Sequence, residues 1–226
     1  MADRRGYFVS FEGGEGSGKT TQIRLLVDWI EQVAPQWRPL TTREPGGTDA
    51  AEDIRTLLVT GTADKWRPAT EAMLMSASRH EHVENVIQPA LAAGRIVISD
   101  RYNDSTTVYQ GLVGGVDSAS IAALHHLACN GLVPDITFLL DMDEEEGLGR
   151  AGDRGGDETR FESKGQSFHA AVRRGFLDLA AGAPDRFIVL SAAAPVEEIA
   201  AKIQSTVNQR LAICGRGRLD CRLSYR

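Results

Sequence analysis

The chain has 226 residues, of which 42% are hydrophobic and 25% charged, and its formal net charge is −6. This length and composition are typical of one soluble globular domain and exclude a disordered, collagen-like or coiled-coil chain. The acidic balance argues against a general nucleic-acid or anionic-membrane binder, and no apolar run approaches the ~20 residues of a membrane span.

The N-terminal residues and the cysteines bear on the compartment. The first residues contain no apolar signal segment, so we expect no secretion. The three cysteines, Cys129, Cys214 and Cys221, are odd in number and lack C-x-x-C spacing, so neither a disulfide framework nor a zinc site is indicated. We therefore expect a cytoplasmic protein.

Short apolar strands alternate with helical patterns along the chain. Strands are predicted at 7–11, 39–42, 96–99, 136–140 and 187–190, and helices after Gly18 and at 48–60, 69–92, 117–130, 166–181 and 195–213. This order predicts an α/β fold with a central parallel sheet between helical layers. Residues 147–165, rich in Gly, Asp and Arg, are expected to form a mobile lid within one domain over 1–213. The arginine-containing tail, 214–226, is expected to be disordered.

A phosphate-binding motif lies between the first predicted strand and helix. Residues 13–20 read Gly-Gly-Glu-Gly-Ser-Gly-Lys-Thr and fit the P-loop pattern G-x-x-x-x-G-K-[ST]. Its glycines let backbone N–H groups converge on phosphate oxygens at a helix N-terminus. Lys19 would neutralise the β- and γ-phosphates, and the Thr20 hydroxyl can hold Mg²⁺. Asp100, at the end of a buried strand, is its expected partner in the Mg²⁺ shell, through water.

Arginines outside the P-loop indicate a second phosphate-bearing ligand. Arg43 and Arg101 each follow a predicted strand and therefore lie at the edge of the sheet where ligands bind. Arginine forks hold a phosphate dianion bidentately. The chain contains no Asn-Lys pair of the kind with which a GTPase reads guanine. These observations favour a P-loop kinase over a GTPase switch.

Four motifs resemble those of the thymidylate kinases, which are ATP-dependent kinases of dTMP. They are Phe-Glu-Gly-Gly-Glu-Gly-Ser-Gly-Lys-Thr-Thr-Gln at 11–22, Arg-Glu-Pro-Gly-Gly-Thr at 43–48, Asp-Arg-Tyr at 100–102 and Tyr-Gln-Gly at 109–111. The resemblance runs from about residue 6 to residue 211. It implies a P-loop NTPase-type sandwich, transfer of phosphate from ATP to dTMP with Mg²⁺, and a homodimer. The implied ATP-binding residues are Gly13, Gly14, Glu15, Gly16, Ser17, Gly18, Lys19, Thr20 and Thr21.

The same resemblance implies how dTMP is held at its phosphate and sugar. Arg43 and Arg101 would grip the monophosphate, and Glu12 would lie beside the phosphates and Mg²⁺. Glu15 would meet the 3′-hydroxyl of the deoxyribose. The Tyr109 ring would crowd the 2′ position and so favour deoxyribose.

The base would be read by Arg79, which would donate to a base carbonyl, and by Thr106 at the pyrimidine edge with Gln110 beside it. One residue departs from the family pattern. Met75 stands where the family usually has a Phe that stacks on thymine. Methionine can lie against a base face, so the change is either tolerated or relaxes the base preference towards dUMP or a modified pyrimidine.

The resemblance also implies a catalytic arginine in the lid. Members that lack a basic residue inside the P-loop place one there, and this lid contains Arg150, Arg154 and Arg160. Arg154 is the first choice for stabilising charge on the transferring phosphoryl group together with Lys19, and Arg160 is the second. Closure of the lid would exclude water and favour transfer over hydrolysis.

Two alternatives to a dTMP kinase stay open at this stage. One is a pyrimidine deoxynucleoside monophosphate kinase with an altered base preference, and the other is a non-catalytic switch that binds ATP. The histidines add no ligand site. His80 and His82 are two residues apart on one helix and cannot face one ligand, so they are interpreted as structural or surface groups.

Overall fold

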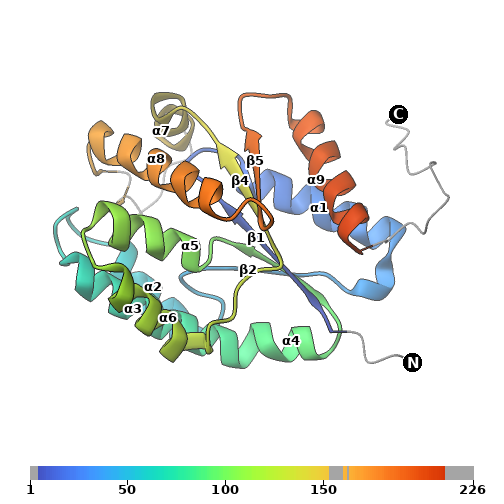
Figure 1. The fold of residues 1–226 in the computed structure, drawn as a ribbon, viewed down its shortest axis with the longest axis horizontal. Coiled ribbons are helices and arrows are strands. Elements are labelled where there is room, and N and C mark those ends of the chain that lie inside the picture. Colours follow the sequence, from blue (N-terminus) through green and yellow to red (C-terminus); the bar gives the residue numbers. More distant parts are fainter. Residues whose placement is uncertain (1–4, 153–159, 162, 212–226) are drawn as a thin grey trace.

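A five-stranded sheet forms the centre of the computed structural model, which describes residues 5–152, 160, 161 and 163–211 (Figure 1). The strand order is β2-β3-β1-β4-β5, and every neighbouring pair is parallel, which confirms the predicted α/β fold. The strands are β1 (Tyr7–Glu12), β2 (Leu40–Arg43), β3 (Ile96–Asp100), β4 (Ile136–Asp141) and β5 (Phe187–Ser191).

The register of the sheet brings the predicted site segments to one edge. Asp100 at the end of β3 pairs with Phe11 of β1 on one side and with Arg43 of β2 on the other. Because parallel strands end at the same edge, the chain leaves β1, β2 and β3 side by side. The P-loop, the segment after Arg43 and the segment after Asp100 therefore start from neighbouring positions.

Helices α1 (Lys19–Val33) and α9 (Val196–Leu211) cover one face of the sheet (Figure 1). Their apolar residues recur at helical spacing, so each helix presents one apolar stripe to the strands. Leu26 of α1 and Ile203 of α9 pack in one buried cluster with Val9, Phe11 and Ile98 of the central strands.

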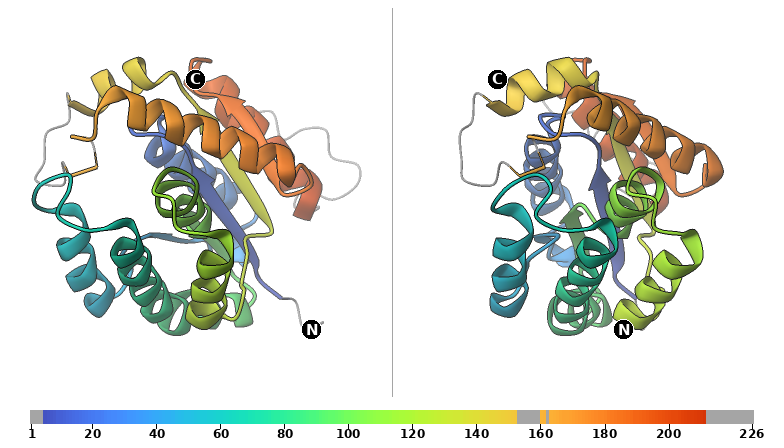
Figure 2. Two further views of the ribbon diagram at one scale, coloured as in Figure 1. Left: turned by 60° about the vertical axis from the view of Figure 1, so that its left-hand side comes forward. Right: turned by 90° about the vertical axis from the view of Figure 1, so that its left-hand side faces the viewer.

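The opposite face is covered by two further groups of helices (Figure 2). The first comprises α2 (Asp49–Val59), α3 (Pro68–His82), the π-helical turn η2 (Val83–Ile87), α4 (Gln88–Ala92) and α6 (Ser118–Cys129). The second comprises α5 (Asn103–Thr106), the π-helical segment η3 (Thr107–Val113) and α8 (Gln166–Gly182). Helices α2 and α3 lie side by side, and α8 packs against η3.

Two helical segments differ from the sequence prediction. The helix expected at 69–92 is interrupted by η2, and residues 103–113, for which no element was predicted, form α5 and η3. Their Asn, Asp, Ser and Thr residues have weak helix propensity. Val108 and Tyr109 nevertheless bury their side chains against α8, and this packing outweighs the local preference.

The segment expected to form the lid begins in a helix and not in an irregular loop, because α7 runs over Glu144–Gly152. Three glutamates occupy its first turn, where negative charge favours a helix N-terminus. The structure also contains a short 3₁₀ turn, η1 (Pro35–Trp37), that was not predicted.

Two sequence predictions fall on residues outside the described part of the chain. They are the lid residue Arg154 and the tail at 214–226. Among the described residues, none of the helices is long and apolar enough to cross a membrane.

Candidate functional site

The P-loop joins the end of β1 to the start of α1 at the centre of the sheet edge. Gly13, Gly16 and Gly18 have φ values of 136°, 69° and 88°, which L-residues with a side chain rarely adopt. A Cβ on Gly16 would lie 2.1 Å from the carbonyl oxygen of Gly147 in α7. The loop therefore needs glycine both for its curl and for its backbone contact with α7.

Lys19 is buried at the mouth of this loop, with 8% of its surface exposed. Its Nζ donates to the Gly14 carbonyl oxygen at 2.9 Å and reaches the Gly13 carbonyl oxygen at 3.3 Å and the Ser17 hydroxyl at 3.4 Å. Burial and the nearby guanidinium of Arg101 lower the pKa of Lys19. The ammonium group is thus held by the loop whose backbone N–H groups bind phosphate in P-loop proteins.

Thr20 and Asp100 come together as predicted. The Thr20 hydroxyl donates to Oδ2 of Asp100 at 3.5 Å across the ends of α1 and β3. Hydroxyl and carboxylate oxygens suit Mg²⁺, which proteins hold through one or two such ligands together with water and substrate phosphates. The described residues contain no group of three or more His, Cys, Asp or Glu that could hold a metal alone. The donor set therefore fits a Mg²⁺ ion that arrives with a nucleotide.

Arg101 links the P-loop to the segment after β3. Its Nη2 donates to Oε1 of Glu15 at 2.8 Å, and its Nη1 donates to the Ser105 hydroxyl at 3.1 Å. The guanidinium also lies 5.5 Å from the centroid of the Tyr109 ring. Arg101 has a φ of 66°, a strained conformation for a residue with a side chain, and its N–H donates to the Phe11 carbonyl oxygen at 2.9 Å.

Glu15 is strongly acidic in this arrangement. Burial alone would raise the pKa of its carboxyl, but the charges of Arg101, Lys19 and His169 outweigh burial and lower the pKa to about 2. The carboxylate therefore stays ionised and can accept a hydrogen bond from a ligand hydroxyl. His169, in α8, is buried beside it and had not been singled out from the sequence.

Glu12 lies beneath Arg101 and is fully buried. It accepts hydrogen bonds from the Tyr102 N–H at 2.8 Å and from the Ser105 hydroxyl at 2.7 Å. Burial, reinforced by the Asp104 carboxylate, raises the pKa of Glu12 to about 7. Ser105, which also contacts Arg101, was missed from the sequence, although it stands within one helical turn of the Asp-Arg-Tyr motif.

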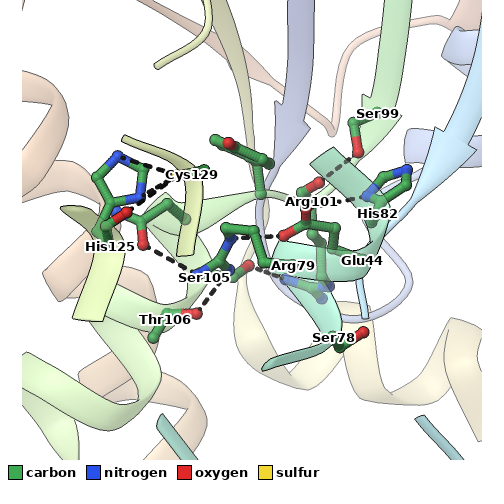
Figure 3. Close-up of polar contacts among 12 residues, drawn as sticks. Glu44, Ser78, Arg79, His82, Ser99, Arg101, Ser105, Thr106, His125 and Cys129 are labelled. Atoms are coloured by element: carbon green, nitrogen blue, oxygen red, sulfur yellow. Dashed lines mark hydrogen bonds and ion pairs between the residues drawn. The ribbon is translucent and has the colours of Figure 1, made fainter. Parts of the chain in front are cut away.

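Arg79 and Thr106, both predicted to read a base, are in direct contact (Figure 3). Nη2 of Arg79 donates to the Thr106 hydroxyl at 2.9 Å, Nη1 donates to Oδ1 of Asn103 at 3.1 Å, and Nε donates to Oε2 of Glu44 at 2.8 Å. Arg79 is only 2% exposed. Met75 is half-buried one turn earlier on the same helix. Glu44 was visible in the Arg-Glu-Pro motif but had been given no role.

Gln110 and Arg160 both contact the buried carboxylate of Glu71, a residue that sequence reasoning missed. Gln110 donates to Oε2 of Glu71 at 2.9 Å, and Arg160 pairs with Oε1 of the same carboxylate. The Arg160 side chain is fully buried. Its Nε donates to the Thr62 carbonyl oxygen, its Nη1 to that of Leu58, and Nη2, the nitrogen that pairs with Glu71, also reaches that of Ala63. The described hydrogen bonds of Arg160 thus tie it to the end of α2 and the start of α3.

The remaining predicted residues are Arg43, Tyr109 and Thr21. Arg43 is exposed and pairs with Glu52 at 2.9 Å, beside Asp100 in the sheet. Tyr109 is buried in an aromatic group with Phe161, Phe168 and Phe176, and it lies under the Arg101 guanidinium. Thr21 is exposed in the first turn of α1.

Comparisons with known proteins bear on this site. The sequence profile of the thymidylate kinase family matches residues 11–203. A thymidylate kinase from Caulobacter vibrioides is 48% identical over 92% of this chain and 99% of its own length. One from Dinoroseobacter shibae is 49% identical over 88% of this chain and 94% of its own length. The crystal structure of thymidylate kinase from Ehrlichia chaffeensis has a TM-score of 0.74 and 31% identity, covering 90% of this chain and 99% of that one.

Proposed function

The chain belongs to the thymidylate kinase family, and from this membership we propose how its residues divide between the two nucleotides of the reaction. The enzyme phosphorylates dTMP to dTDP, with ATP as the phosphoryl donor. The residue assignments below rest on the geometry at the sheet edge together with the family motifs. The main observation behind these assignments is the ion pair between Glu15 of the P-loop and Arg101 at the end of β3.

On the donor side, residues 13–21 bind ATP. The P-loop backbone N–H groups and the start of α1 surround the phosphates, and Lys19 neutralises charge on the β- and γ-phosphates. Thr20 and Asp100 would hold Mg²⁺, with Asp100 acting through a water molecule. When bound, Mg²⁺ supplies electrostatic stabilisation of the charge on the transferring group.

On the acceptor side, Arg43 and Arg101 hold the dTMP monophosphate. Glu15, ionised at neutral pH, accepts a hydrogen bond from the 3′-hydroxyl, and Glu12 lies beneath the phosphates. Tyr109 packs where a 2′-hydroxyl would project. The Glu15–Arg101 contact supports this assignment because it joins the donor loop directly to the acceptor clamp, so both phosphates meet at one place.

The base lies against Arg79 and Thr106, with Gln110 and Met75 nearby. The contact between Arg79 and Thr106 supports this assignment, because it presents a guanidinium donor and a hydroxyl together. A guanidinium donates and never accepts, so it favours a base carbonyl at that position over an amino group.

Transfer proceeds directly from donor to acceptor without a covalent intermediate, through positioning and neutralisation of charge. We assign the lid arginine that stabilises the transferring phosphoryl group to Arg154. The alternative, Arg160, donates to three carbonyl oxygens and a carboxylate in a buried cluster, which leaves it poorly placed to reach a nucleotide.

The experiment that tests the proposed function measures ADP production from ATP and Mg²⁺ with dTMP, dUMP, dCMP, dGMP and UMP in parallel. We expect a strong preference for dTMP, which would make Met75 a tolerated substitution. A profile shifted towards dUMP or other acceptors would contradict the base assignment. ATP turnover without any dependence on an acceptor would contradict the kinase.

Removal of the Arg101 guanidinium tests the division between the two nucleotide sites. Arg101→Ala is expected to raise the dTMP dissociation constant ~10- to 150-fold, since charge-assisted hydrogen bonds to phosphate contribute ~1.5–3 kcal/mol. ATP affinity should change little. Titration calorimetry with each nucleotide measures both, and Arg24→Ala on the exposed face of α1 is the matched control. Lost ATP affinity with intact dTMP affinity would reverse the assignment.

Three coarser features are also proposed, the first and third from the sequence and the second from the family resemblance. They are a single kinase domain over 1–213 with a lid at about 147–165, a homodimer, and a place in the cytoplasm. Sedimentation velocity of the full chain measures the oligomeric state directly, and a monomer at micromolar concentration would contradict the homodimer.

A further inference from the structure

The loop that follows β2 wraps around a histidine that the reaction, as described so far, does not use. His82, at the end of α3, is completely buried, and Glu44 is 5% exposed. Gly47 has a φ of 94°, and a Cβ there would lie 2.4 Å from Cδ2 of His82. The loop can pass so close to the imidazole only because this position is glycine.

Four side chains, Thr42, His82, Glu44 and Arg79, form a continuous hydrogen-bonded line at this loop. Figure 3 shows the part that joins His82, Glu44 and Arg79. The Thr42 hydroxyl lies 2.5 Å from Nε2 of His82, and Nδ1 of His82 lies 3.0 Å from Oε1 of Glu44. Oε2 of Glu44 accepts from Nε of Arg79 at 2.8 Å. A neutral imidazole with its proton on Nδ1 fits both of its hydrogen bonds, because Nδ1 donates to Glu44 and Nε2 accepts from the Thr42 hydroxyl. Both carboxylate oxygens of Glu44 are therefore engaged.

This line has the hydroxyl–imidazole–carboxylate order of a nucleophilic triad, but it cannot act as one. His82 has no exposed surface, and the carboxylate that would orient it is paired with the guanidinium of Arg79. The contacts instead hold Arg79 in place. Strand β2 holds His82 through Thr42, His82 holds Glu44, and Glu44 holds Arg79.

Arg79 consequently has one orientation. A guanidinium carries five N–H groups, of which Glu44, Asn103 and Thr106 take three. Its carbon also lies 5.2 Å from the centroid of the Tyr102 ring, which fixes the plane of the fork. Within the described contacts, one N–H on each terminal nitrogen is left for a ligand, and its direction is set by the Glu44 contact at the other edge of the guanidinium.

We propose that Glu44 and His82 are positioning residues that set base selectivity by preventing Arg79 from turning away from the base. The inference rests on the proposed function, which assigns Arg79 to a base carbonyl. A 4-carbonyl, as in thymine, accepts from the fixed guanidinium, whereas the 4-amino group of cytosine meets it donor against donor. A mobile arginine would swing aside and relieve that clash, so discrimination against cytosine depends on the rigidity of its support.

The test compares kcat/KM for dTMP and dCMP in the full-length enzyme. His82→Leu removes both imidazole hydrogen bonds, and we expect the dTMP-to-dCMP ratio to fall ~10-fold, the effect of about one hydrogen bond. The KM for ATP should stay unchanged. His82→Asn, whose amide nitrogen branches from Cγ as Nδ1 does, can still donate to Glu44 and should restore most of the ratio. His126→Leu, at an exposed histidine on α6, is the matched control and should leave the ratio unchanged.

A purely structural role for His82 predicts a different result. Activity on both acceptors would then fall together, the ratio would stay constant, and His82→Asn would restore nothing; this result would overturn the proposal. If His82→Leu does not fold, Thr42→Val provides the second variant, because it removes the outer hydroxyl and leaves the Glu44–Arg79 pair intact. It should lower the ratio ~3-fold, and an unchanged ratio would overturn the proposal. A wild-type enzyme that treats dTMP and dCMP alike would instead refute the base-reading role that the proposed function assigns to Arg79.

Discussion

At the scale of single residues, the site combines strain, burial and charge at the ends of two strands. Arg101 adopts a left-handed conformation and is held by Phe11, Glu15 and Ser105 at once. Such a conformation persists only where its surroundings determine it, and it is typical of ligand clamps. The same segment buries Glu12 beneath Arg101, and this burial raises the pKa of its carboxyl.

Glu12 should make stability depend on pH. Its pKa is raised from 4.5 to about 7, so the stability that its protonated form contributes is present below pH 4.5 and is lost as the pH rises towards 7. Glu12→Gln cannot ionise and so does not lose this stability. The melting temperature of the variant minus that of wild type should therefore increase from pH 5 to pH 8, by ~2–4 °C for each kcal/mol of stability that wild type loses. Thermal unfolding without nucleotides at several pH values measures the difference, with the exposed Glu31→Gln as control. A constant difference across pH would contradict the prediction.

At the scale of secondary-structure elements, buried polar contacts join segments that lie far apart in the chain. The Glu71 carboxylate in α3 accepts a hydrogen bond from Gln110 in η3 and pairs with Arg160, which lies 89 residues further along the chain. The pair is fully enclosed, so each charge depends on the other for solvation. This cluster ties α2, α3 and η3 together.

Removing one member of this pair should therefore destabilise the protein strongly. Arg160→Met leaves Glu71 buried without its main partner and should lower the free energy of unfolding by ~3–5 kcal/mol. Adding Glu71→Leu should recover much of this loss, because no isolated charge is then buried. Urea unfolding of the single and double variants measures both, and Arg24→Met at an exposed ion pair should cost less than ~1 kcal/mol. Unchanged stability with a reduced kcat would instead place Arg160 in the chemistry.

At the scale of the whole molecule, the central strands form the edge of the sheet from which the P-loop and the segment after β3 extend. Phe11 of β1 and Phe138 of β4 are fully buried, with ring centroids 5.3 Å apart. They lie under the P-loop, so the core and the phosphate site share one support. The edge strand β5 is more open, and Val189 is 47% exposed.

The core should therefore be far more sensitive than the edge to the same kind of substitution. Phe138→Ala should lower the free energy of unfolding by ~3–5 kcal/mol, since a large cavity opens in the cluster between the sheet and helices α1 and α9. Val189→Ala, in the neighbouring strand, should cost ~0.5 kcal/mol or less. Chemical denaturation measures both, and equal losses would contradict this description of the core.

Much of the architecture was predictable because its signals are local. Buried parallel strands appear as short apolar runs, and the P-loop is a contiguous pattern whose glycines are required by its own backbone. Asp100 and Arg101 could be placed at the ligand edge because they directly follow a strand. Residues 103–113 were not predicted as helical, since their propensity is weak and their stability comes from packing against α8.

The motifs and the strand pattern predicted the family and the fold, whereas the partners of each charged side chain follow from the folded structure. The sequence did not indicate that Arg160 would pair with Glu71, or that the loop at Gly47 would pack against His82. Both outcomes depend on partners distant in sequence. Burial and Coulomb interaction act through space, so the pKa of Glu12 and the orientation of Arg79 are set by the assembled fold.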